Sequence, residues 1–229
     1  MNTGYSISDY CVSLGRILNL PRVKASWQCM ITNKRLFDLF FAIPGFLFLS
    51  PFFLVVAMGI KIDSPGRVFF RQMRIGRLGQ PFHLIKFRTM REDAEAFGPQ
   101  ITIGRDSRIT RLGCLLRKAK IDELPQLYNV LKGEMSLVGP RPEVPRYVAL
   151  YSDEQRQVLN LFPGITDPAS IIYRDESEIL GNSNDPEGTY INLIMPEKIR
   201  INLTYGKRQG PFADLKTILD TFAALSSVR

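Results

Sequence analysis

A long apolar segment near the start of the chain limits the folds open to it more than any other feature. Between Leu36 and Ile60 the only charged residue is Asp38, and phenylalanine and leucine occur on every face of the helix that this segment predicts. About 20 apolar residues are enough to cross the hydrocarbon core of a bilayer as a helix. The alternative is the core helix of a soluble protein, which the segment fits poorly because it has no polar stripe. We therefore expect it to insert into a membrane.

Prolines and flanking charges predict how this segment enters the membrane. Pro44 and the pair Ser50-Pro51 lie inside it, and proline removes a helix hydrogen bond and kinks the axis. A straight span is the alternative, but it would leave one basic flank on the far side, against the positive-inside tendency. We expect a re-entrant helix over residues 32–62, kinked at Ser50-Pro51. The flanking cations are Arg22, Lys24, Lys34 and Arg35 before the segment, and Lys61, Arg67 and Arg71 after it.

The charge and length of the chain limit its partners and its organisation. A formal net charge of +8 favours anionic partners, which include nucleic acid, acidic lipid headgroups and nucleotide phosphates. A chain of 229 residues with 45% hydrophobic residues can bury one core, so we expect one domain over residues 63–229, the part that follows the apolar segment. Residues 1–31 show no signal-peptide pattern, and we expect a short leader there with an amphipathic helix around residues 12–20.

Cysteine and histidine usage excludes several kinds of site. The three cysteines are widely spaced and form no CxxC pair, which argues against a disulfide framework or a zinc site and favours a reducing environment. His83 is the only histidine, and its place among alternating apolar residues indicates a buried or interfacial structural side chain. Catalysis by a serine–histidine–aspartate triad is therefore not expected.

The rest of the pattern predicts an α+β, mostly helical domain with a small β-hairpin and amphipathic interfacial helices. Residues 68–72 and 82–88 are expected as the two strands of the hairpin, because glycines and a proline separate them. We expect a turn at residues 162–166 and a loop at residues 181–188. The last helix packs its apolar face on the core or lays it on the bilayer surface. The helices expected from periodicity and caps span residues 107–119 (capped by Ser107), 122–133, 196–205 and 212–225.

Two adjacent carboxylates, Asp122 and Glu123, are the strongest chemical feature of the chain. They lie among cations and glycine–proline turns, a setting typical of a site for polyphosphate and a divalent metal. Asp122 is expected as the N-cap of a short helix, and plain capping is its structural alternative. A helix N-terminus stabilises an anionic carboxylate and offers N–H groups to a phosphoryl group. We expect one carboxylate to attack or bind metal while the other orients the metal or the acceptor.

Several cations are placed to contact phosphate near these carboxylates. Lys86 and Arg88 end a predicted strand, and Arg117 comes about one and a half helical turns before Asp122. Arg141 lies in the stiff run Gly139-Pro140-Arg141-Pro142, which suits a guanidinium fork directed at phosphate oxygens. The alternative is that the basic residues only meet solvent or anionic lipid.

Five motifs follow one another along the chain. They are the apolar segment with Ser50-Pro51, Lys86-Phe87-Arg88-Thr89-Met90, Asp122-Glu123-Leu124-Pro125-Gln126-Leu127, Ser136-Leu137-Val138-Gly139-Pro140-Arg141-Pro142, and Pro163-Gly164-Ile165-Thr166. In this order they resemble the bacterial sugar transferase family, the monotopic phosphoglycosyl transferases that begin glycan assembly. The resemblance covers about residues 32 to 225, and it implies a cytosolic catalytic domain in which a UDP-sugar gives its sugar-1-phosphate to undecaprenyl phosphate. It also implies that UMP is released and that Mg²⁺ is required.

The resemblance also implies roles, a location and partners. Asp122 is the implied nucleophile, and Glu123 assists with the metal or the lipid phosphate. Arg117, Arg141 and Arg174 fall at phosphate-binding positions, and Ser50-Pro51 matches the kink of the re-entrant helix. The implied location is the bacterial inner (cytoplasmic) membrane with the catalytic domain facing the cytoplasm. Membrane lipids and downstream glycosyltransferases are the further partners expected.

Two departures and two rival interpretations complete the sequence analysis. Many family members have glycine and then alanine–glutamine where this chain has Asp167-Pro168-Ala169-Ser170, and glycine where it has Tyr173. We expect this region to contact the sugar donor. A nucleic-acid-binding protein would share the net charge, but the apolar segment contradicts it. A catalytically inactive membrane scaffold of a glycan assembly complex is the other rival, and the retained carboxylates and arginines argue against it.

Overall fold

In the computed structural model of the protein, which describes residues 33–92 and 106–226, the apolar segment forms one helix, α2 (Asn33–Asp63). It is the one helix of the described residues that is long and apolar enough to cross a membrane, and only 11% of its most apolar window is buried. Phe40 and Phe48 are 72% and 85% exposed, which is unfavourable in water. The leader and short helix expected before residue 32 lie outside the described ranges.

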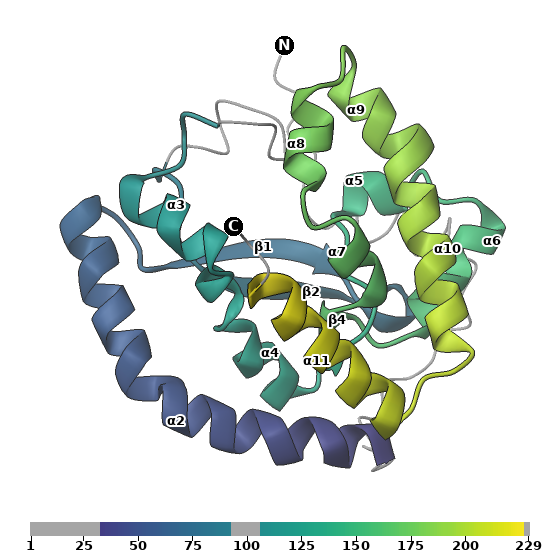
Figure 1. Ribbon diagram of the computed structural model, residues 1–229, viewed down its shortest axis with the longest axis horizontal. Helices are drawn as coiled ribbons and strands as arrows, with labels where there is room; N and C mark the ends of the chain where they lie inside the picture. The colour runs from purple at the N-terminus through teal and green to yellow at the C-terminus, as the bar shows by residue number, and fades with distance from the viewer. Residues whose placement is uncertain (1–32, 93–105, 227–229) are drawn as a thin grey trace.

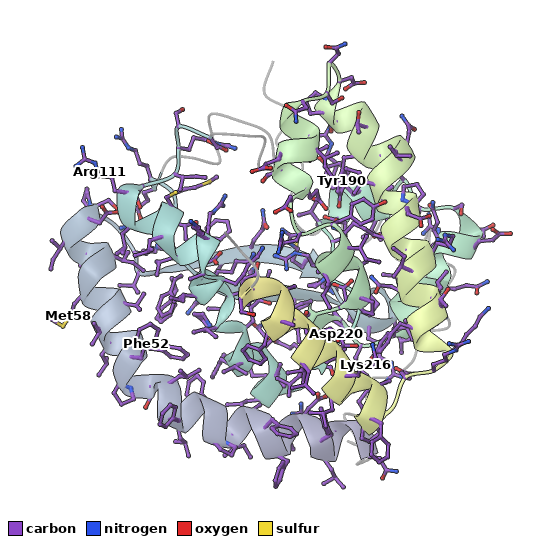
Figure 2. The ribbon with its side chains drawn as sticks, in the orientation of Figure 1. Phe52, Met58, Arg111, Tyr190, Lys216 and Asp220 are labelled. Atoms are coloured by element: carbon purple, nitrogen blue, oxygen red, sulfur yellow. The ribbon has the colours of Figure 1, made fainter. Side chains whose placement is uncertain are left out.

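Helix α2 is bent near its middle, as Figure 1 shows, and Phe52 lies just beyond the bend in Figure 2. Pro44 and Pro51 both lie inside the helix, and Ser50 Oγ donates a hydrogen bond to the Leu47 carbonyl oxygen at 2.8 Å. Proline leaves the carbonyl one turn earlier without its N–H partner, so this serine satisfies one of the backbone groups there. The bend therefore has an identifiable cause in the sequence.

Both limbs of α2 pack against the same body. Ala42, before the bend, belongs to a hydrophobic cluster with Leu127 and Val130. Beyond the bend, Val56 and Ile60 belong to a second cluster with Phe87 and Leu116. The helix thus contacts the rest of the described structure on either side of its bend and exposes its outer apolar surface.

Two small sheets lie behind the helices that follow. Strands β1 (Phe69–Ile75) and β2 (Pro81–Phe87) form an antiparallel hairpin that pairs Phe69 with Phe87 and Ile75 with Pro81. This confirms the expected hairpin, although β1 extends three residues further. The expectation of a simple turn at residues 162–166 is wrong, because Gly164–Thr166 forms strand β4, parallel to β3 (Ser136–Val138).

Short helices make up most of the remaining chain, and two longer ones, α10 and α11, confirm the helices expected over residues 196–205 and 212–225. The expected loop at 181–188 is wrong in its second half, where α9 begins. The elements are η1 (Arg77–Gly79), α3 (Arg111–Lys118), η3 (Ile121–Glu123), α4 (Gln126–Lys132), α5 (Pro145–Val148), α6 (Asp153–Arg156), η4 (Gln157–Asn160), α7 (Pro168–Ile172), α8 (Glu176–Gly181), α9 (Pro186–Thr189), η5 (Tyr190–Ile194), α10 (Met195–Gly206) and α11 (Pro211–Ser226).

Two expected caps are wrong, and of the two places expected for His83, buried or interfacial, the buried one is wrong. Thr110, not Ser107, caps α3, and its side chain accepts a hydrogen bond from Gly113 N. Asp122 does not cap α4, which begins only at Gln126 with Pro125 in the cap position. His83 alternates outward from the hairpin and is exposed, because the buried face of β2 is formed by its neighbours Phe82 and Leu84.

Candidate active site

A cleft of about 2000 Å³ brings together all seven residues that the sequence singled out for catalysis and phosphate binding. Its walls come from β1, β2, α3, η3, α8, α10 and α11 and from the loop after β3. The kink residues Ser50 and Pro51 are not part of it. The seven residues are Lys86, Arg88, Arg117, Asp122, Glu123, Arg141 and Arg174.

The two carboxylates lie on the short 3-10 turn η3. Lys120 just before it has a left-handed backbone with φ 55° and ψ 19°, a conformation that is uncommon for a side chain other than glycine. Glu123 N donates to the Lys120 carbonyl and Leu124 N to that of Ile121, which closes the turn. Asp122 and Glu123 are 6% and 8% exposed, so both carboxylates are removed from bulk water.

Glu123 is fully engaged by two cations. Arg141 Nη1 donates to Glu123 Oε2 at 3.0 Å, Arg141 Nη2 donates to Oε1, and Lys86 Nζ lies 3.1 Å from Oε1. Burial alone would raise the pKa of Glu123, but the charges of Arg141 and Lys86 outweigh it and hold that pKa well below its usual range. Glu123 is therefore ionised and held in place.

Asp122 is in the opposite situation. Its Oδ1 is buried and has no hydrogen-bond partner among the described residues. Burial raises the pKa of Asp122, and the neighbouring Glu123 charge raises it further, while Lys86, Arg117 and Lys120 act against the shift. Native structures leave few buried polar atoms unsatisfied, and those that remain often mark a functional site. Of the two carboxylates, Asp122 is the one with an oxygen that no donor of the described residues engages.

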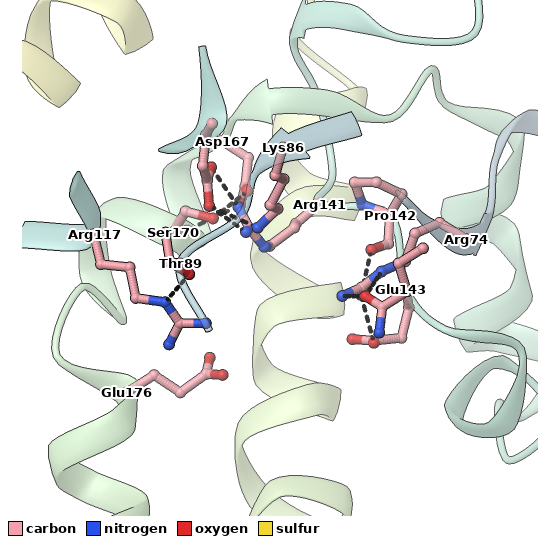
Figure 3. Close-up of polar contacts among 12 residues, drawn as sticks. Arg74, Lys86, Thr89, Arg117, Arg141, Pro142, Glu143, Asp167, Ser170 and Glu176 are labelled. Atoms are coloured by element: carbon pink, nitrogen blue, oxygen red, sulfur yellow. Dashed lines mark hydrogen bonds and ion pairs between the residues drawn. The ribbon is translucent and has the colours of Figure 1, made fainter. Parts of the chain in front are cut away.

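Strand pairing places Arg141 against Glu123. β3 leads into Gly139, and a Cβ on this residue would lie 2.0 Å from the Phe162 carbonyl oxygen. A Cβ on Gly164 would lie 2.1 Å from Gly139 N. Both segments of the chain therefore need glycine at the point where they approach each other so closely. The loop that follows carries Arg141 beside Lys86 in Figure 3. Burial lowers the pKa of Lys86 to about 8, although the Glu123 charge opposes the shift.

A tight contact between α3 and the end of β2 places Arg117. Its Nε donates to Thr89 Oγ1 at 2.8 Å (Figure 3). Thr110 N donates to the Thr89 carbonyl at 3.0 Å, and a Cβ on Gly113 would lie 2.1 Å from that same oxygen. Burial lowers the pKa of Arg117, while Asp122 and other carboxylates act against the shift. Arg117 thus lies close enough to Asp122 for their charges to interact.

Arg88 and Arg174 line the cleft but already bind other groups. Arg88 Nη2 donates to the Ser64 carbonyl at 2.7 Å, and its Nη1 donates to the Pro65 carbonyl, so it holds the turn that follows α2. Arg174 pairs with Asp175, and its Nη1 donates to the Ala224 carbonyl of α11 at 2.8 Å. Arg174 is thus tied to α11, and Arg88 to the chain leaving α2.

The arrangement is a cationic cleft around one engaged and one available carboxylate, and the comparison with known families agrees with it. The sequence model described as "Bacterial sugar transferase" matches residues 29–227. The chain belongs to the bacterial sugar transferase family.

Three relatives illustrate the range of this sugar transferase family. A UDP-glucose:undecaprenyl-phosphate glucose-1-phosphate transferase of Caulobacter vibrioides is 37% identical over 213 residues, which are 90% of this chain and 72% of the relative. A protein of the same name from Xanthomonas campestris pv. campestris is 36% identical over 196 residues, 83% of this chain and 38% of the relative. A UDP-N-acetylgalactosamine-undecaprenyl-phosphate N-acetylgalactosaminephosphotransferase of Aeromonas hydrophila is 41% identical over 165 residues, 70% of this chain and 37% of the relative. The matched region is thus little more than a third of the last two proteins.

A second polar cluster in this sugar transferase was missed by sequence analysis. Arg74 Nη1 donates to the Pro142 carbonyl at 3.0 Å and pairs with Glu143, which also accepts a hydrogen bond from the Tyr190 hydroxyl. All three side chains line the cleft. Glu143 follows the proline–arginine–proline run directly, and that adjacency was the one local signal available. In residues 167–170, where the sequence departs from many family members, Asp167 is fully buried and caps α7 by accepting a hydrogen bond from Ser170 N at 3.0 Å.

The carboxylates of the cleft suit a magnesium site that is completed by substrate phosphates. Among the described residues no group of three or more histidine, cysteine, aspartate or glutamate side chains could hold a metal ion. Magnesium, however, is often bound by one or two carboxylates together with substrate phosphates. The unpartnered Oδ1 of Asp122 fits such a site, whereas both oxygens of Glu123 already accept from cations. Asp122 is the residue suited to a magnesium ion shared with a bound diphosphate.

Proposed function

We propose that the protein transfers a sugar-1-phosphate from a UDP-sugar to undecaprenyl phosphate, releases UMP, and so begins the assembly of a bacterial polysaccharide or glycoconjugate. The observation that carries this proposal is the unpartnered Oδ1 of Asp122 beside the fully engaged Glu123. The names of the relatives from Caulobacter and Xanthomonas support both substrates. The apolar helix α2 suits a lipid acceptor.

In the first step, an Asp122 carboxylate oxygen attacks the phosphorus that bears the sugar. The new O–P bond forms while the bond from that phosphorus to the bridging oxygen breaks, and UMP leaves with the bonding electron pair. A carboxylate can attack the phosphorus of a diphosphate only where nearby cations reduce the charge repulsion. Lys86, Arg117 and Lys120 all lie close enough to Asp122 to shift its pKa, so they can act in this way.

In the second step, a phosphate oxygen of the acceptor lipid attacks the same phosphorus and displaces the Asp122 carboxylate. The products are a polyprenyl diphosphate sugar and the free enzyme. Splitting the transfer lets a soluble donor and a membrane lipid use one site in turn. Glu123 does not react, because Arg141 and Lys86 hold it; it fixes these two cations where the phosphates bind.

Magnesium completes the proposed site. When bound, it would neutralise charge on the diphosphate of the donor and on the leaving UMP. Asp122 is the residue best suited to hold it, and a role for Glu123 would require one of its ion pairs to open.

For the membrane helix we propose a re-entrant topology at the cytoplasmic membrane, with the catalytic domain facing the cytoplasm. Ala42 before the bend and Ile60 beyond it both pack on this domain, which supports the idea that α2 enters and leaves by one face. Single cysteines at residues 30 and 62 test this by labelling with a membrane-impermeant maleimide. Labelling of the two positions from opposite sides would contradict it.

The test of the proposed reaction is UMP release by the purified full-length protein in detergent, with magnesium, undecaprenyl phosphate and a panel of UDP-sugars. We expect release with one donor, which also identifies the sugar. Asp122→Asn is expected to lower the rate by about 1000-fold or more. The matched control is Asp153→Asn, because this aspartate is solvent-exposed and outside the cleft. No release by folded protein with any donor would favour the inactive scaffold.

A further inference from the structure

Helix α11 buries two of its polar side chains, Asp214 and Thr217, while the charged pair Lys216 and Asp220 stays exposed. Asp214 is fully buried and accepts hydrogen bonds from Lys34 Nζ of α2, at 2.6 Å, and from the Tyr205 hydroxyl. Thr217 is buried as well, and the Thr221 hydroxyl lies 2.8 Å from the Thr166 hydroxyl of β4. Polar contacts therefore attach α11 to the body of the protein, and its apolar side chains are left outside.

The apolar side chains of α11 divide into two sets. Leu215, Ile218, Phe222 and Leu225 line the cleft, and their spacing of three, four and three residues places them on one face of the helix. Phe222 is 65% exposed. Leu219, on the same helix and 59% exposed, is not part of the cleft. The apolar stripe formed by the first set is therefore a wall of the cleft.

This stripe continues towards the membrane helix. Ile165 of β4, Leu137 of β3 and Leu127 of α4 also line the cleft, and so does Phe41 of α2. Figure 1 shows the first turn of α11 beside the start of α2, where the Lys34–Asp214 ion pair joins the two helices. Apolar side chains of α2, α4, β3, β4 and α11 therefore contribute to one lining of the cleft.

Another part of the cleft carries polar groups, although the hairpin side also contributes apolar side chains such as Phe69 and Phe87. Arg74, Glu143, Tyr190 and the Lys198–Glu176 ion pair provide hydrogen-bonding and charged groups there. A UDP-sugar is polar along its whole length, whereas the acceptor joins one phosphate to a long hydrocarbon chain. The two kinds of wall thus match the two substrates.

We propose that the apolar stripe of α11 binds the part of the polyprenyl chain nearest the acceptor phosphate. This inference rests on the proposed function. The phosphate end lies by Arg174, whose Nη1 donates to the Ala224 carbonyl at the end of the stripe, and the chain runs along Phe222, Ile218 and Leu215 towards α2. The chain is held by apolar contact, because covering the exposed stripe removes apolar surface from water.

The kinetic test compares Phe222→Ser with Leu219→Ser in the full-length protein in detergent, because both side chains are exposed to a similar extent and only Phe222 lines the cleft. We expect Phe222→Ser to raise the KM for undecaprenyl phosphate about tenfold, equivalent to about 1.4 kcal/mol. The KM for the UDP-sugar and UMP release in a first turnover without acceptor stay unchanged. Leu219→Ser keeps all three values. An unchanged acceptor KM in Phe222→Ser would overturn the inference.

Two further measurements separate the other outcomes. Sedimentation with vesicles of phosphatidylethanolamine and phosphatidylglycerol reports contact with the bilayer. Equal loss of vesicle binding in both variants, with no change in KM, would show that the stripe meets the bilayer instead of the acceptor. A photoreactive polyprenyl phosphate crosslinks to the residues that it contacts in the wild-type protein. This measurement requires neither sugar transfer nor an amino-acid substitution. Labelling of α11 in a protein that transfers no sugar would refute the proposed function alone, and labelling elsewhere would refute the inference.

Discussion

Arg141 donates two hydrogen bonds to Glu123, one from each terminal nitrogen, and the pair closes the side of the cleft formed by the loop after β3. The planar guanidinium fork fits a carboxylate with both oxygens at once, a geometry that lysine cannot reproduce. The adjacent Asp122 has no such partner among the described residues for its Oδ1. Two carboxylates next to one another in the chain are thus given different roles by segments distant in sequence.

Replacing Arg141 by lysine keeps the charge and removes the fork. We expect Arg141→Lys to lower kcat by about 100-fold, because Glu123 and the phosphates lose a positioned pair of donors. Arg146→Lys is the matched control, since Arg146 is exposed on the same segment and pairs with the partly exposed Glu187. UMP release at saturating UDP-sugar measures the effect, and normal turnover in Arg141→Lys would show that the fork is dispensable.

Asp122→Asn is expected to stabilise the protein while it abolishes transfer. The pKa of Asp122 is raised in the folded chain, so stability falls as the pH rises through that folded-state value. Neutral asparagine avoids this loss, and we expect a gain of about 1 kcal/mol at pH 7.5, or roughly 2–4 °C in Tm. Differential scanning fluorimetry of both proteins tests it, with Asp153→Asn expected to leave Tm unchanged. A lower Tm for Asp122→Asn would mean that its attraction to the nearby cations outweighs its burial.

Above pH 8, deprotonation of Lys86 is expected to lower the rate of UMP release and to raise the contribution of this lysine to the free energy of unfolding. Burial lowers its pKa from 10.5 to about 8, so the cation that faces Glu123 is lost as the pH rises through 8. The rate is then expected to fall about tenfold per pH unit. Between pH 8 and 10.5 the unfolded chain binds more protons at this lysine, so its contribution to the free energy of unfolding rises with pH.

Lys86→Arg provides the control for this pH dependence. Arginine stays protonated across the range, so the alkaline fall in rate is expected to disappear while some activity remains. Rates from pH 6.5 to 10, together with urea unfolding at the same pH values, give both curves. An identical alkaline limb in the arginine variant would assign the fall to another group.

Sequence patterns predicted the elements that depend on local periodicity. The apolar helix, the hairpin and the last two helices were expected, because each shows its burial pattern within one segment. The strand Gly164–Thr166 was expected as a turn, since its parallel partner β3 is far away in the chain and a three-residue strand has no period of its own. The expected cap at Asp122 failed because nothing about a lysine signals the left-handed backbone of Lys120.

The candidate site could be predicted in its residues but not in its pairings. The seven cleft residues were recognisable by their motifs. The pairing of cations with carboxylates was not, because it depends on contacts between β2, η3 and the loop after β3. Lys86 and Arg88 illustrate this. They are two positions apart, which predicts one face of a strand, but β2 ends at Phe87 and Arg88 instead binds the turn after α2. Arg74 and Glu143 were missed because their pairing is also nonlocal.

The first turns of α2 are expected to position the loop that carries Arg141. Asp38 is 3% exposed, and its Oδ1 accepts hydrogen bonds from Ser136 Oγ at 2.9 Å and Leu137 N at 3.0 Å, both in β3. Asp38→Ala leaves these donors unsatisfied and is expected to lower the free energy of unfolding by about 1–3 kcal/mol.

Rescue by a smaller change separates this positioning role from simple loss of charge. Asp38→Asn keeps one acceptor oxygen and is expected to recover most of the stability and the kcat lost in Asp38→Ala. Urea unfolding and UMP release measure both variants, and Asp63→Ala at the far end of α2 serves as the control. If Asp38→Ala lowered stability without lowering kcat, α2 would not position the loop.

The close contact between Gly113 and Thr89 is expected to be required for the position of Arg117 in the cleft. A Cβ at residue 113 would lie 2.1 Å from the Thr89 carbonyl oxygen, so α3 must move away from the end of β2 in Gly113→Ala. Such overpacking typically costs about 1–3 kcal/mol. The shift also lengthens the 2.8 Å contact between Arg117 Nε and Thr89 Oγ1, and we expect kcat to fall about tenfold. Gly210→Ala is the matched control because nothing lies within 4 Å of its added Cβ. Thermal unfolding and UMP release test both variants, and equal behaviour of the two would show that α3 can shift without disturbing Arg117.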